Sequence, residues 1–240
     1  MSGIVFIISA PSGSGKTTLT NEVMKLVEGL KFSISYTTRK PRGSEVNGRE
    51  YFFVQRPEFE AMLQGGEFLE HANVFGDYYG TAQRFLEDAR QQGKDLVLDI
   101  DVQGAAQVKQ KLPEAVSIFI LPPSRQELET RLRRRSQAEH VNAPEVIERR
   151  LAEARKEIEN YRKYDYIVVN DRLEESIDKL KAIVAAERQR RSIGKASESA
   201  EVREAERCRL ENVRADAERI LNSFAPPANP AVKKDEVKVP

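Results

Sequence analysis

Four short apolar runs, rich in Val and Ile, recur along the chain, and longer stretches with helical spacing separate them. A strand buried on both faces of a parallel sheet reads as a continuous apolar run, and its neighbours along the chain are helices. The alternation therefore predicts an α/β fold, with a parallel sheet flanked by helices. The predicted strands cover residues 4–8, 95–100, 116–121 and 166–169.

Two further regions depart from this alternation. Between the first helix and the strand at 95–100, residues 32–36 and 51–54 are rich in aromatic side chains and enclose a loop rich in Gly, Pro and Arg. This composition predicts a small β-rich insertion, at about residues 33–94. Farther along, residues 126–135 and 144–164 read as charged helices without a wide apolar stripe. A pair of this kind suits a mobile helical lid, at about residues 126–160.

The composition changes near residue 193, where we expect the core domain, residues 1–193, to end. The remaining segment, 194–240, is predicted to be an extension with one charged helix over 201–224 and a disordered end rich in Pro and Lys. One face of that helix is apolar, so it could dock on the core or pair two chains, and the sequence leaves monomer and homo-oligomer equally open. This face carries Leu210, Val213, Ala217, Ile220, Leu221 and Phe224.

Composition restricts the partners and the compartment. The 240 residues carry a formal net charge of only +1, so there is no global field to attract nucleic acid. The single cysteine, Cys208, cannot form an internal disulfide, which suits a reducing compartment. No stretch approaches the roughly 20 apolar residues of a membrane-spanning helix. We therefore expect a cytoplasmic protein that binds neither nucleic acid nor membrane.

A phosphate-binding loop (P-loop) follows the first predicted strand directly. Residues 10–17 read APSGSGKT and lead into a helix. In such a loop glycines let backbone N–H groups surround a phosphate, Lys16 reaches the β and γ phosphates, and the Thr17 hydroxyl binds Mg²⁺. Ala10 stands where the pattern has its first glycine. The sequence thus predicts a nucleoside triphosphate site with Mg²⁺ as cofactor, formed by Ser12, Gly13, Ser14, Gly15, Lys16, Thr17 and Thr18.

A P-loop alone fits a kinase, a GTPase, a motor or a transporter subunit, so the acceptor must be inferred from other residues. Arg39 and Arg42 lie three apart in an extended segment and could grip one phosphate together, although a solvated loop is the alternative. Downstream tyrosines add hydroxyl donors. A carboxylate such as Glu70 suits the paired N1–H and 2-amino donors of guanine.

Several motifs, in this order, closely resemble those of the guanylate kinase family. They are APSGSGKT, SYTTRKPR, NGREYFFV, GEFLEHANVFGDYYGT, LDIDVQG and IVVND, and the resemblance spans about residues 3–193. It implies a P-loop NTPase-like sheet with a GMP-binding insertion, and Mg²⁺-dependent transfer of phosphate from ATP to GMP, with dGMP as a further acceptor. It also implies that Ser35, Glu70, Thr81 and Asp101 read guanine, that Arg39, Arg42, Tyr51 and Tyr79 hold the GMP phosphate, and that Asn170 lies near the ATP adenine. For the two tyrosines, core packing is the alternative.

Two carboxylates end the second predicted strand. Asp99 and Asp101 are two residues apart and so project to one face, at the edge of the sheet where ligands of such folds bind. The resemblance favours Asp101 at guanine and Asp99 near the metal, through water, or near a phosphate-gripping arginine. A plain helix cap is the alternative for Asp101.

Arginines cluster in the predicted lid, at positions 131, 133, 134 and 135 and again at 149 and 150. On their own they fit a solvated helix face or an RNA-binding patch. In a P-loop kinase, lid arginines neutralise charge on the transferring phosphoryl group. The resemblance selects Arg131, Arg135 and Arg150, which with Lys16 and Arg39 form the expected catalytic set. Ser136 stands where the family often has glycine.

Two other functions remain open from the sequence. A kinase for a ribose phosphate would share the fold, but it would not need Ser35, Glu70 and Thr81. A non-catalytic guanylate-kinase-like module would bind a phosphopeptide through the same arginines. Such a module is expected to lose the P-loop, whereas Lys16 and Thr17 are present here.

Overall fold

The central sheet has five strands, all parallel, in the order β2-β7-β1-β8-β9. The computed structural model describes residues 3–74, 76–138, 144–193 and 199–225. Each predicted strand is present to within one residue at either end, whereas β2, only three residues long, was not predicted. The strands are β1 (Val5–Ser9), β2 (Leu30–Phe32), β7 (Asp95–Asp99), β8 (Val116–Leu121) and β9 (Tyr166–Val169).

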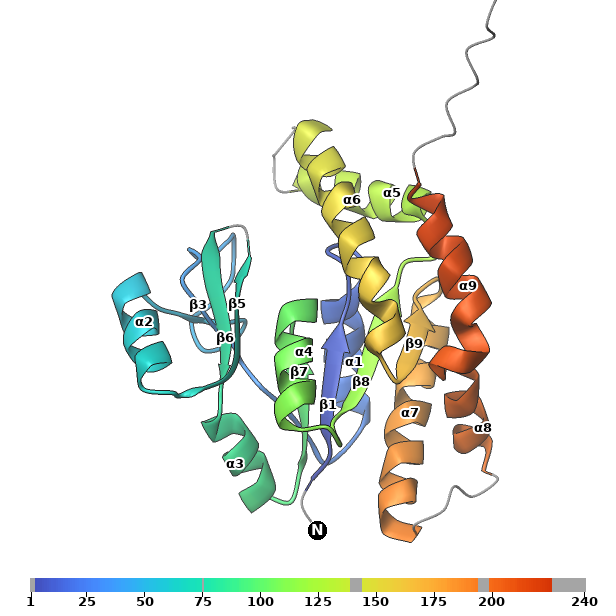
Figure 1. Ribbon diagram of the computed structural model, residues 1–240, viewed down its shortest axis with the longest axis horizontal. Coiled ribbons are helices and arrows are strands. Elements are labelled where there is room, and N and C mark those ends of the chain that lie inside the picture. Colours follow the sequence, from blue (N-terminus) through green and yellow to red (C-terminus); the bar gives the residue numbers. More distant parts are fainter. Residues whose placement is uncertain (1–2, 75, 139–143, 194–198, 226–240) are drawn as a thin grey trace, which may run out of the picture.

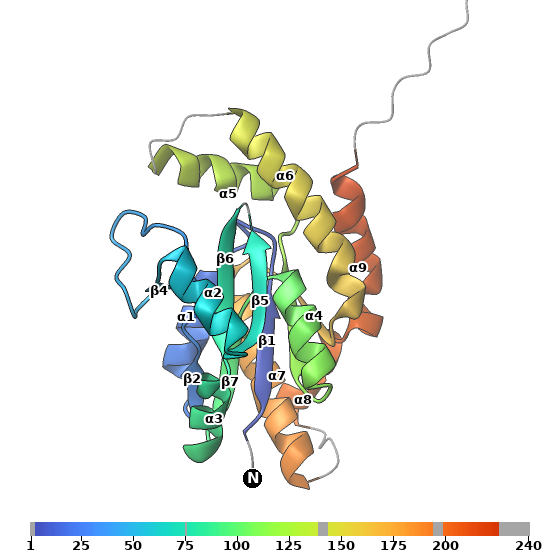
Figure 2. The same ribbon diagram turned by 60° about the vertical axis from the view of Figure 1, so that its left-hand side comes forward.

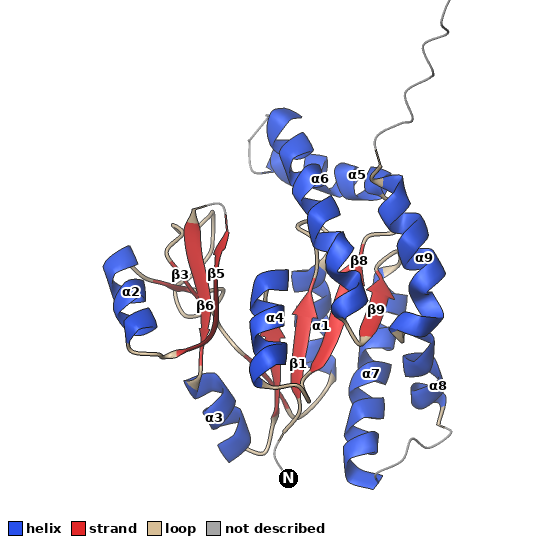
Figure 3. Cartoon of the chain, viewed as in Figure 1, coloured by secondary structure: helices blue, strands red, loops and turns tan. Residues whose placement is uncertain are grey.

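Helices cover both faces of this sheet, as Figures 1 and 3 show. Successive side chains of a strand point to opposite faces, so Phe6 and Ile8 of β1 pack in one apolar cluster and Ile7 packs in the other. The first cluster includes buried residues of α1 (Lys16–Leu26), α7 (Leu173–Ile193) and α8 (Ala200–Arg207). The second includes residues of α4 (Val102–Lys111) and of α9 (Leu210–Ser223). The predicted α/β class is confirmed.

A second sheet of four strands stands apart from the central one, in the order β4-β3-β6-β5 (Figure 1). Its aromatic residues form a separate cluster in which Phe59 stacks on Phe68 and on Tyr78. This unit occupies the region predicted as a β-rich insertion. Its elements are β3 (Tyr36–Thr37), β4 (Phe52–Phe53), α2 (Arg56–Gln64), β5 (Phe68–Val74), β6 (Asp77–Ala82) and α3 (Arg84–Gln91).

The predicted lid region contains two helices, α5 (Arg125–Ala138) and α6 (Pro144–Ile158), and a short 3₁₀ helix, η1 (Glu159–Lys163). Residues 139–143, within the predicted lid, lie outside the described residues. One expectation was wrong, because α6 does carry an apolar stripe. Ile147, Leu151, Ala154 and Ile158 are all buried. Charged residues at the intervening positions hid this three-and-four spacing.

The extension contains two helices, α8 and α9 (Leu210–Ser223), where a single helix was predicted. The break lies at Cys208 and Arg209, whose backbone pairs with the edge strand β9. The N–H of Ile167 donates to the carbonyl of Cys208 at 2.8 Å, and Arg209 forms an antiparallel bridge with Tyr166. A helix could not make these contacts because its own bonds would use the same groups. The Pro- and Lys-rich end, 226–240, lies outside the described residues.

The apolar face of α9 packs on its own chain. Ala217, Ile220 and Phe224 are buried in the cluster that also contains α6. Among the described helices, none is both long and apolar enough to cross a membrane.

Replacing Phe59 by Ala tests whether the insertion depends on its own aromatic cluster. The ring is fully buried, with its centroid 4.4 Å from that of Phe68 and 5.4 Å from that of Tyr78. We expect Phe59→Ala to lower the free energy of unfolding by about 3–5 kcal/mol, measured by urea denaturation, because it leaves a cavity. Leu63→Ala, at an exposed position of the same helix, is the control and should cost far less. Equal losses of unfolding free energy in the two variants would contradict the dependence of the insertion on this aromatic cluster.

Candidate active site

A cavity of about 550 Å³ lies between the P-loop, the insertion and the α5–α6 pair. The walls come from all three regions, which are far apart in the sequence. Cationic and anionic side chains face each other across it. Among the predicted site residues, those that line it are Ser12, Gly13, Gly15, Lys16, Thr17, Thr18, Ser35, Arg42, Tyr51, Glu70, Tyr79, Asp99, Asp101, Arg131, Arg135 and Arg150.

The P-loop forms a sharp turn between β1 and α1, and glycines make that turn possible. Gly13 and Gly15 have φ of 92° and 89°, which side chains of L-residues rarely adopt. Space is limited as well, since a Cβ on Gly13 would lie 2.9 Å from a methyl carbon of Leu132 in α5. Ala10, in place of the first glycine of the pattern, is buried at the end of β1. The loop therefore keeps its turn without that glycine.

Two side chains hold the P-loop in place at the carbonyl of Ser14. The Asn170 amide, at the end of β9, donates to it at 2.8 Å, and an Arg131 nitrogen lies 3.5 Å from it. Arg131 also donates to the carbonyl of Asn170 at 3.0 Å and pairs with Glu127. Asn170 is buried and supports the backbone of the P-loop, while its expected place near the ATP adenine stays a prediction.

Lys16 reaches the end of β7, where it pairs with Asp99 and donates to the carbonyl of Ile100 at 3.3 Å. Asp99 therefore holds the lysine at the cavity wall. Asp101 caps α4 by accepting the N–H of Gly104 at 2.8 Å, and it also lines the cavity. Asp101 is thus a helix cap, as the alternative interpretation held, and it is also part of the cavity wall.

The residues predicted to read guanine lie together. The Ser35 and Thr81 hydroxyl oxygens are 2.9 Å apart, and Thr81 hydrogen-bonds to Glu70. Burial raises the pKa of the Glu70 carboxyl to about 7, with a further rise from Asp101, while the Thr81 hydrogen bond opposes the shift. A Cβ on Gly104 would lie 2.9 Å from the Glu70 carboxyl carbon and closer still to an oxygen. The absence of a side chain at Gly104 therefore makes room for this carboxyl group.

The four residues predicted to hold a monophosphate divide into two sets. Arg42, Tyr51 and Tyr79 line the cavity. Arg39 is buried instead, and its guanidinium makes two hydrogen bonds to the carboxylate of Glu45, at 2.9 and 3.0 Å. Its Nε donates to the hydroxyl of Tyr79 at 3.2 Å. In this arrangement Arg39 positions a wall residue, and the Glu45 contact could not be read from the sequence.

Sequence reasoning missed Glu157, which lines the cavity from the last turn of α6. Burial raises the pKa of its carboxyl to about 7, while Lys16 and a hydrogen bond from the backbone of Ser12 act in the opposite direction. Arg150 lies seven residues earlier, two turns of helix, and so projects from the same face. The spacing of Arg150 and Glu157 was therefore a sequence signal for this site residue. In a strongly charged helix, the same spacing is also typical of a solvent-exposed face.

Comparisons with known proteins agree with one another. The family model described as Guanylate kinase matches residues 3–187. A guanylate kinase of Koribacter versatilis (strain Ellin345) is 62% identical over 232 residues, 96% of this chain and 99% of the relative. A guanylate kinase of Escherichia coli (strain K12) is 48% identical over 192 residues, 79% of this chain and 91% of the relative. A crystal structure of guanylate kinase from Anaplasma phagocytophilum matches with a TM-score of 0.63 and 36% identity, over 78% of this chain and 86% of that one.

The raised pKa of Glu70 predicts a dependence of stability on pH. Between the ordinary pKa of 4.5 and about 7, the folded chain retains a proton that the unfolded chain has released. The free energy of unfolding therefore falls as pH rises through this window. We expect Glu70→Gln to fall less steeply than wild type in urea denaturation across that range. Glu67→Gln, at an exposed neighbour, should keep the wild-type slope, and equal slopes for all three proteins would contradict the prediction.

Proposed function

The chain belongs to the guanylate kinase family, and we propose that its cavity binds ATP and GMP together and transfers the terminal phosphoryl group of ATP to GMP. The carrying observation is that one cavity joins a P-loop to a buried carboxylate and a group of arginines and tyrosines. The P-loop side suits the triphosphate of ATP, and the insertion side suits a guanine nucleotide monophosphate. The products are ADP and GDP.

Glu70 is the proposed guanine-reading group. Burial disfavours the ionised form of a carboxylate, and this cost, only partly offset by Thr81, is what raises the pKa of Glu70. Guanine presents the N1–H and 2-amino donors side by side, so it would stabilise the ionised carboxylate. Adenine lacks that pair and would leave Glu70 poorly matched, which supports discrimination against AMP. Ser35, Thr81 and Asp101 complete the proposed base site, and dGMP presents the same base.

Positioning and charge neutralisation account for the proposed transfer. An oxygen of the GMP phosphate attacks the γ-phosphorus of ATP, the bond to the β–γ bridging oxygen breaks, and that oxygen leaves with ADP. No side-chain base is needed, because the second pKa of a phosphate monoester is about 6 and the nucleophile is already dianionic. Arg42, Tyr51 and Tyr79 would hold the acceptor phosphate, and Arg39 would first have to exchange Glu45 for it.

The remaining cations act on the phosphoryl group in transit. Lys16 would bind the β and γ phosphates of ATP. We propose α5 and α6 as a lid whose closure brings Arg131, Arg135 and Arg150 to the transferring group and excludes water. All three line the cavity already. Water exclusion matters because water is a competing acceptor for the phosphoryl group.

The oxygen donors on the cavity wall fit Mg²⁺ bound together with ATP. The Thr17 hydroxyl and the Asp99 carboxylate both line the cavity beside Lys16, and Mg²⁺ prefers oxygen ligands of this kind, several of them water. When bound, the ion would neutralise charge on the β and γ phosphates. In this assignment Thr17 is a direct ligand and Asp99 acts through water. We also propose a cytoplasmic location, consistent with the free thiol of Cys208.

A coupled assay of ADP formation tests the function. With ATP and Mg²⁺, we expect GMP to support turnover and AMP, CMP and UMP to be poor acceptors. Lys16→Ala should lower kcat/KM by about 10²–10³-fold, because a cation at the reacting phosphates is lost. Lys25→Ala, at an exposed position of the same helix, should behave as wild type. Tight GMP binding without turnover would indicate the binding module, and turnover of a ribose phosphate instead would indicate the other kinase.

Replacing Gly104 by Ala tests how Glu70 is positioned. The new Cβ would collide with the Glu70 carboxyl and displace it. We expect the KM for GMP to rise by about 10- to 100-fold, with little change in the KM for ATP. Gly65→Ala is the control, because a Cβ there makes only ordinary contacts, at 3.4 Å or more. An unchanged KM for GMP in Gly104→Ala would contradict the assigned role of Glu70.

A further inference from the structure

The extension that follows residue 193 is anchored to the edge of the central sheet. Besides the bridge between Arg209 and Tyr166, the N–H of Leu210 lies 3.3 Å from the carbonyl of Asp165. The Arg209 guanidinium lies over the Tyr166 ring, 4.3 Å from its centroid, and pairs with Glu187 at 3.1 Å. Helices α8 and α9 lie beyond residues 3–187, the part matched by the family model. Helices α8 and α9 therefore lie outside the matched family domain, and the start of α9 is held at the edge of the central sheet.

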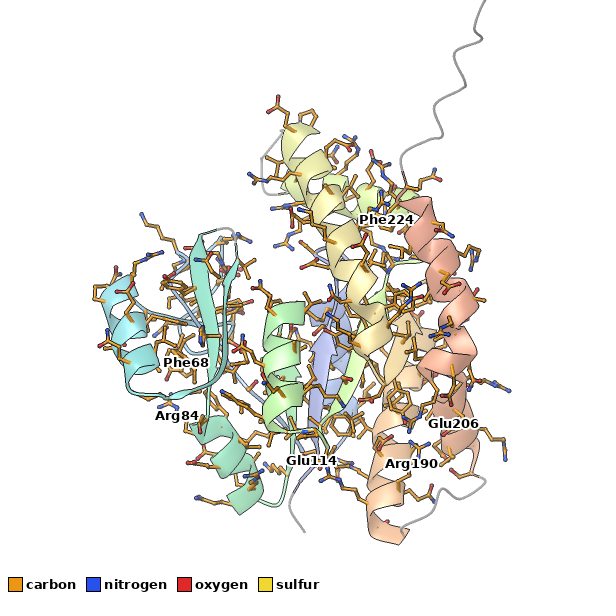
Figure 4. The ribbon with its side chains drawn as sticks, in the orientation of Figure 1. Phe68, Arg84, Glu114, Arg190, Glu206 and Phe224 are labelled. Carbon is orange, nitrogen blue, oxygen red and sulfur yellow. The ribbon has the colours of Figure 1, made fainter. Side chains whose placement is uncertain are left out.

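From this anchor α9 runs to the base of the proposed lid, where its last residues contact both lid helices (Figures 2 and 4). The Ser223 hydroxyl accepts the backbone N–H of Arg125, the first residue of α5, at 3.0 Å. The carbonyl of Phe224 accepts from the Arg155 guanidinium, near the end of α6, at 3.4 Å. One short segment thus reaches both points at which the lid joins the core.

These contacts satisfy groups that helix ends otherwise leave unpaired. The first N–H groups of a helix and the last carbonyls have no partner within the helix. Ser124 bonds to the N–H of Glu127, and Ser223 supplies an acceptor for Arg125. The carbonyl at the end of α9 finds a cationic donor in Arg155. The negative end of the α9 dipole also faces the positive end of α5, which favours the contact.

Apolar packing reinforces the polar contacts. Ile220 and Phe224 are buried in the cluster that includes Leu128 of α5 and Leu151 of α6. Figure 4 shows Phe224 at the end of α9 beside the two lid helices. Because a buried aromatic side chain contributes several times the free energy of an exposed hydrogen bond, Phe224 is the main attachment and Ser223 sets its register.

We propose that α9 braces the lid, holding the core-side ends of α5 and α6 so that their arginines close over the P-loop in a fixed position. Arg131 lies six residues from Arg125, and Arg150 lies five residues from Arg155, so movement at either braced end is transmitted to the cavity along a short helix. Ser223 and Phe224 are positioning residues that touch neither substrate. The proposal rests on the proposed phosphoryl transfer, because it concerns closure over those substrates.

The test compares the double variant Ser223→Ala/Phe224→Ala with wild type in two independent measurements. Amide hydrogen exchange in the full-length protein reports opening at residues 125–128 and 155–158, and it needs no turnover. Kinetics with ATP and GMP report the consequence for closure. The matched control is Val202→Ala, which removes buried apolar volume from α8 in the other cluster, away from the lid. Phe224→Leu is the conservative variant, and it should restore most of both properties.

We expect faster exchange at both lid ends in the double variant and a fall in kcat/KM for ATP of about two- to thirtyfold. The Kd for GMP alone should stay within about twofold, because the insertion does not depend on α9. Val202→Ala should lower the melting temperature without either effect. Loss of activity in proportion to the folded fraction, with wild-type KM and exchange, would overturn the brace.

Single Ser223→Ala provides the test if the double variant does not fold. It should speed exchange at residues 125–128, and wild-type exchange there would overturn the proposal. The two proposals fail separately. Absence of GMP-dependent ADP formation in the wild type would refute the phosphoryl transfer, whereas normal turnover with unaltered lid exchange in the variants would refute the brace alone.

Discussion

The structure depends on how the backbone of the P-loop is held at Ser14. The loop must turn sharply enough to direct successive N–H groups into one cavity, and such a turn is stable only if its outward carbonyls find partners. Asn170 from the end of β9 and Arg131 from α5 meet at that one carbonyl. The nucleotide loop is thereby joined to the sheet edge and to the lid, so the three parts of the site share one fixed point.

A parallel sheet explains why the other polar groups gather nearby. Its strands all end at the same edge, so the residues that follow β1, β7 and β9 become neighbours despite lying far apart in the chain. The insertion packs along α4, where Gln107 hydrogen-bonds to the backbone of His71 and Glu70 occupies the space left by the missing side chain of Gly104. Guanine recognition, in the proposed function, thus depends on a glycine in the core domain.

The sequence identified what depends on local pattern and missed what depends on tertiary pairing. The four predicted strands were located to within one residue because strands buried on both faces are continuously apolar, and the P-loop because its glycines and lysine are adjacent. The contacts of Arg39 and Asn170 were less accessible, since Glu45 and Ser14 become their partners only in the folded chain. The break between α8 and α9 arises from pairing with β9, which helical periodicity cannot reveal.

Two largely buried carboxylates face cations across the cavity. Their burial lowers the free energy of unfolding, and a ligand that pairs with them would raise it again. Glu70 and Glu157 both have a pKa raised to about 7, mainly by burial. In the proposed function, a substrate that supplies donors to Glu70 removes this penalty, and its phosphates give further anionic partners to arginines such as Arg131, which already pairs with Glu127. In the proposed mechanism, binding energy would therefore help to assemble the closed state, while the folded chain bears the cost of preorganisation. The proposed brace by α9 is consistent with this arrangement, because it would strengthen closure without filling the cavity.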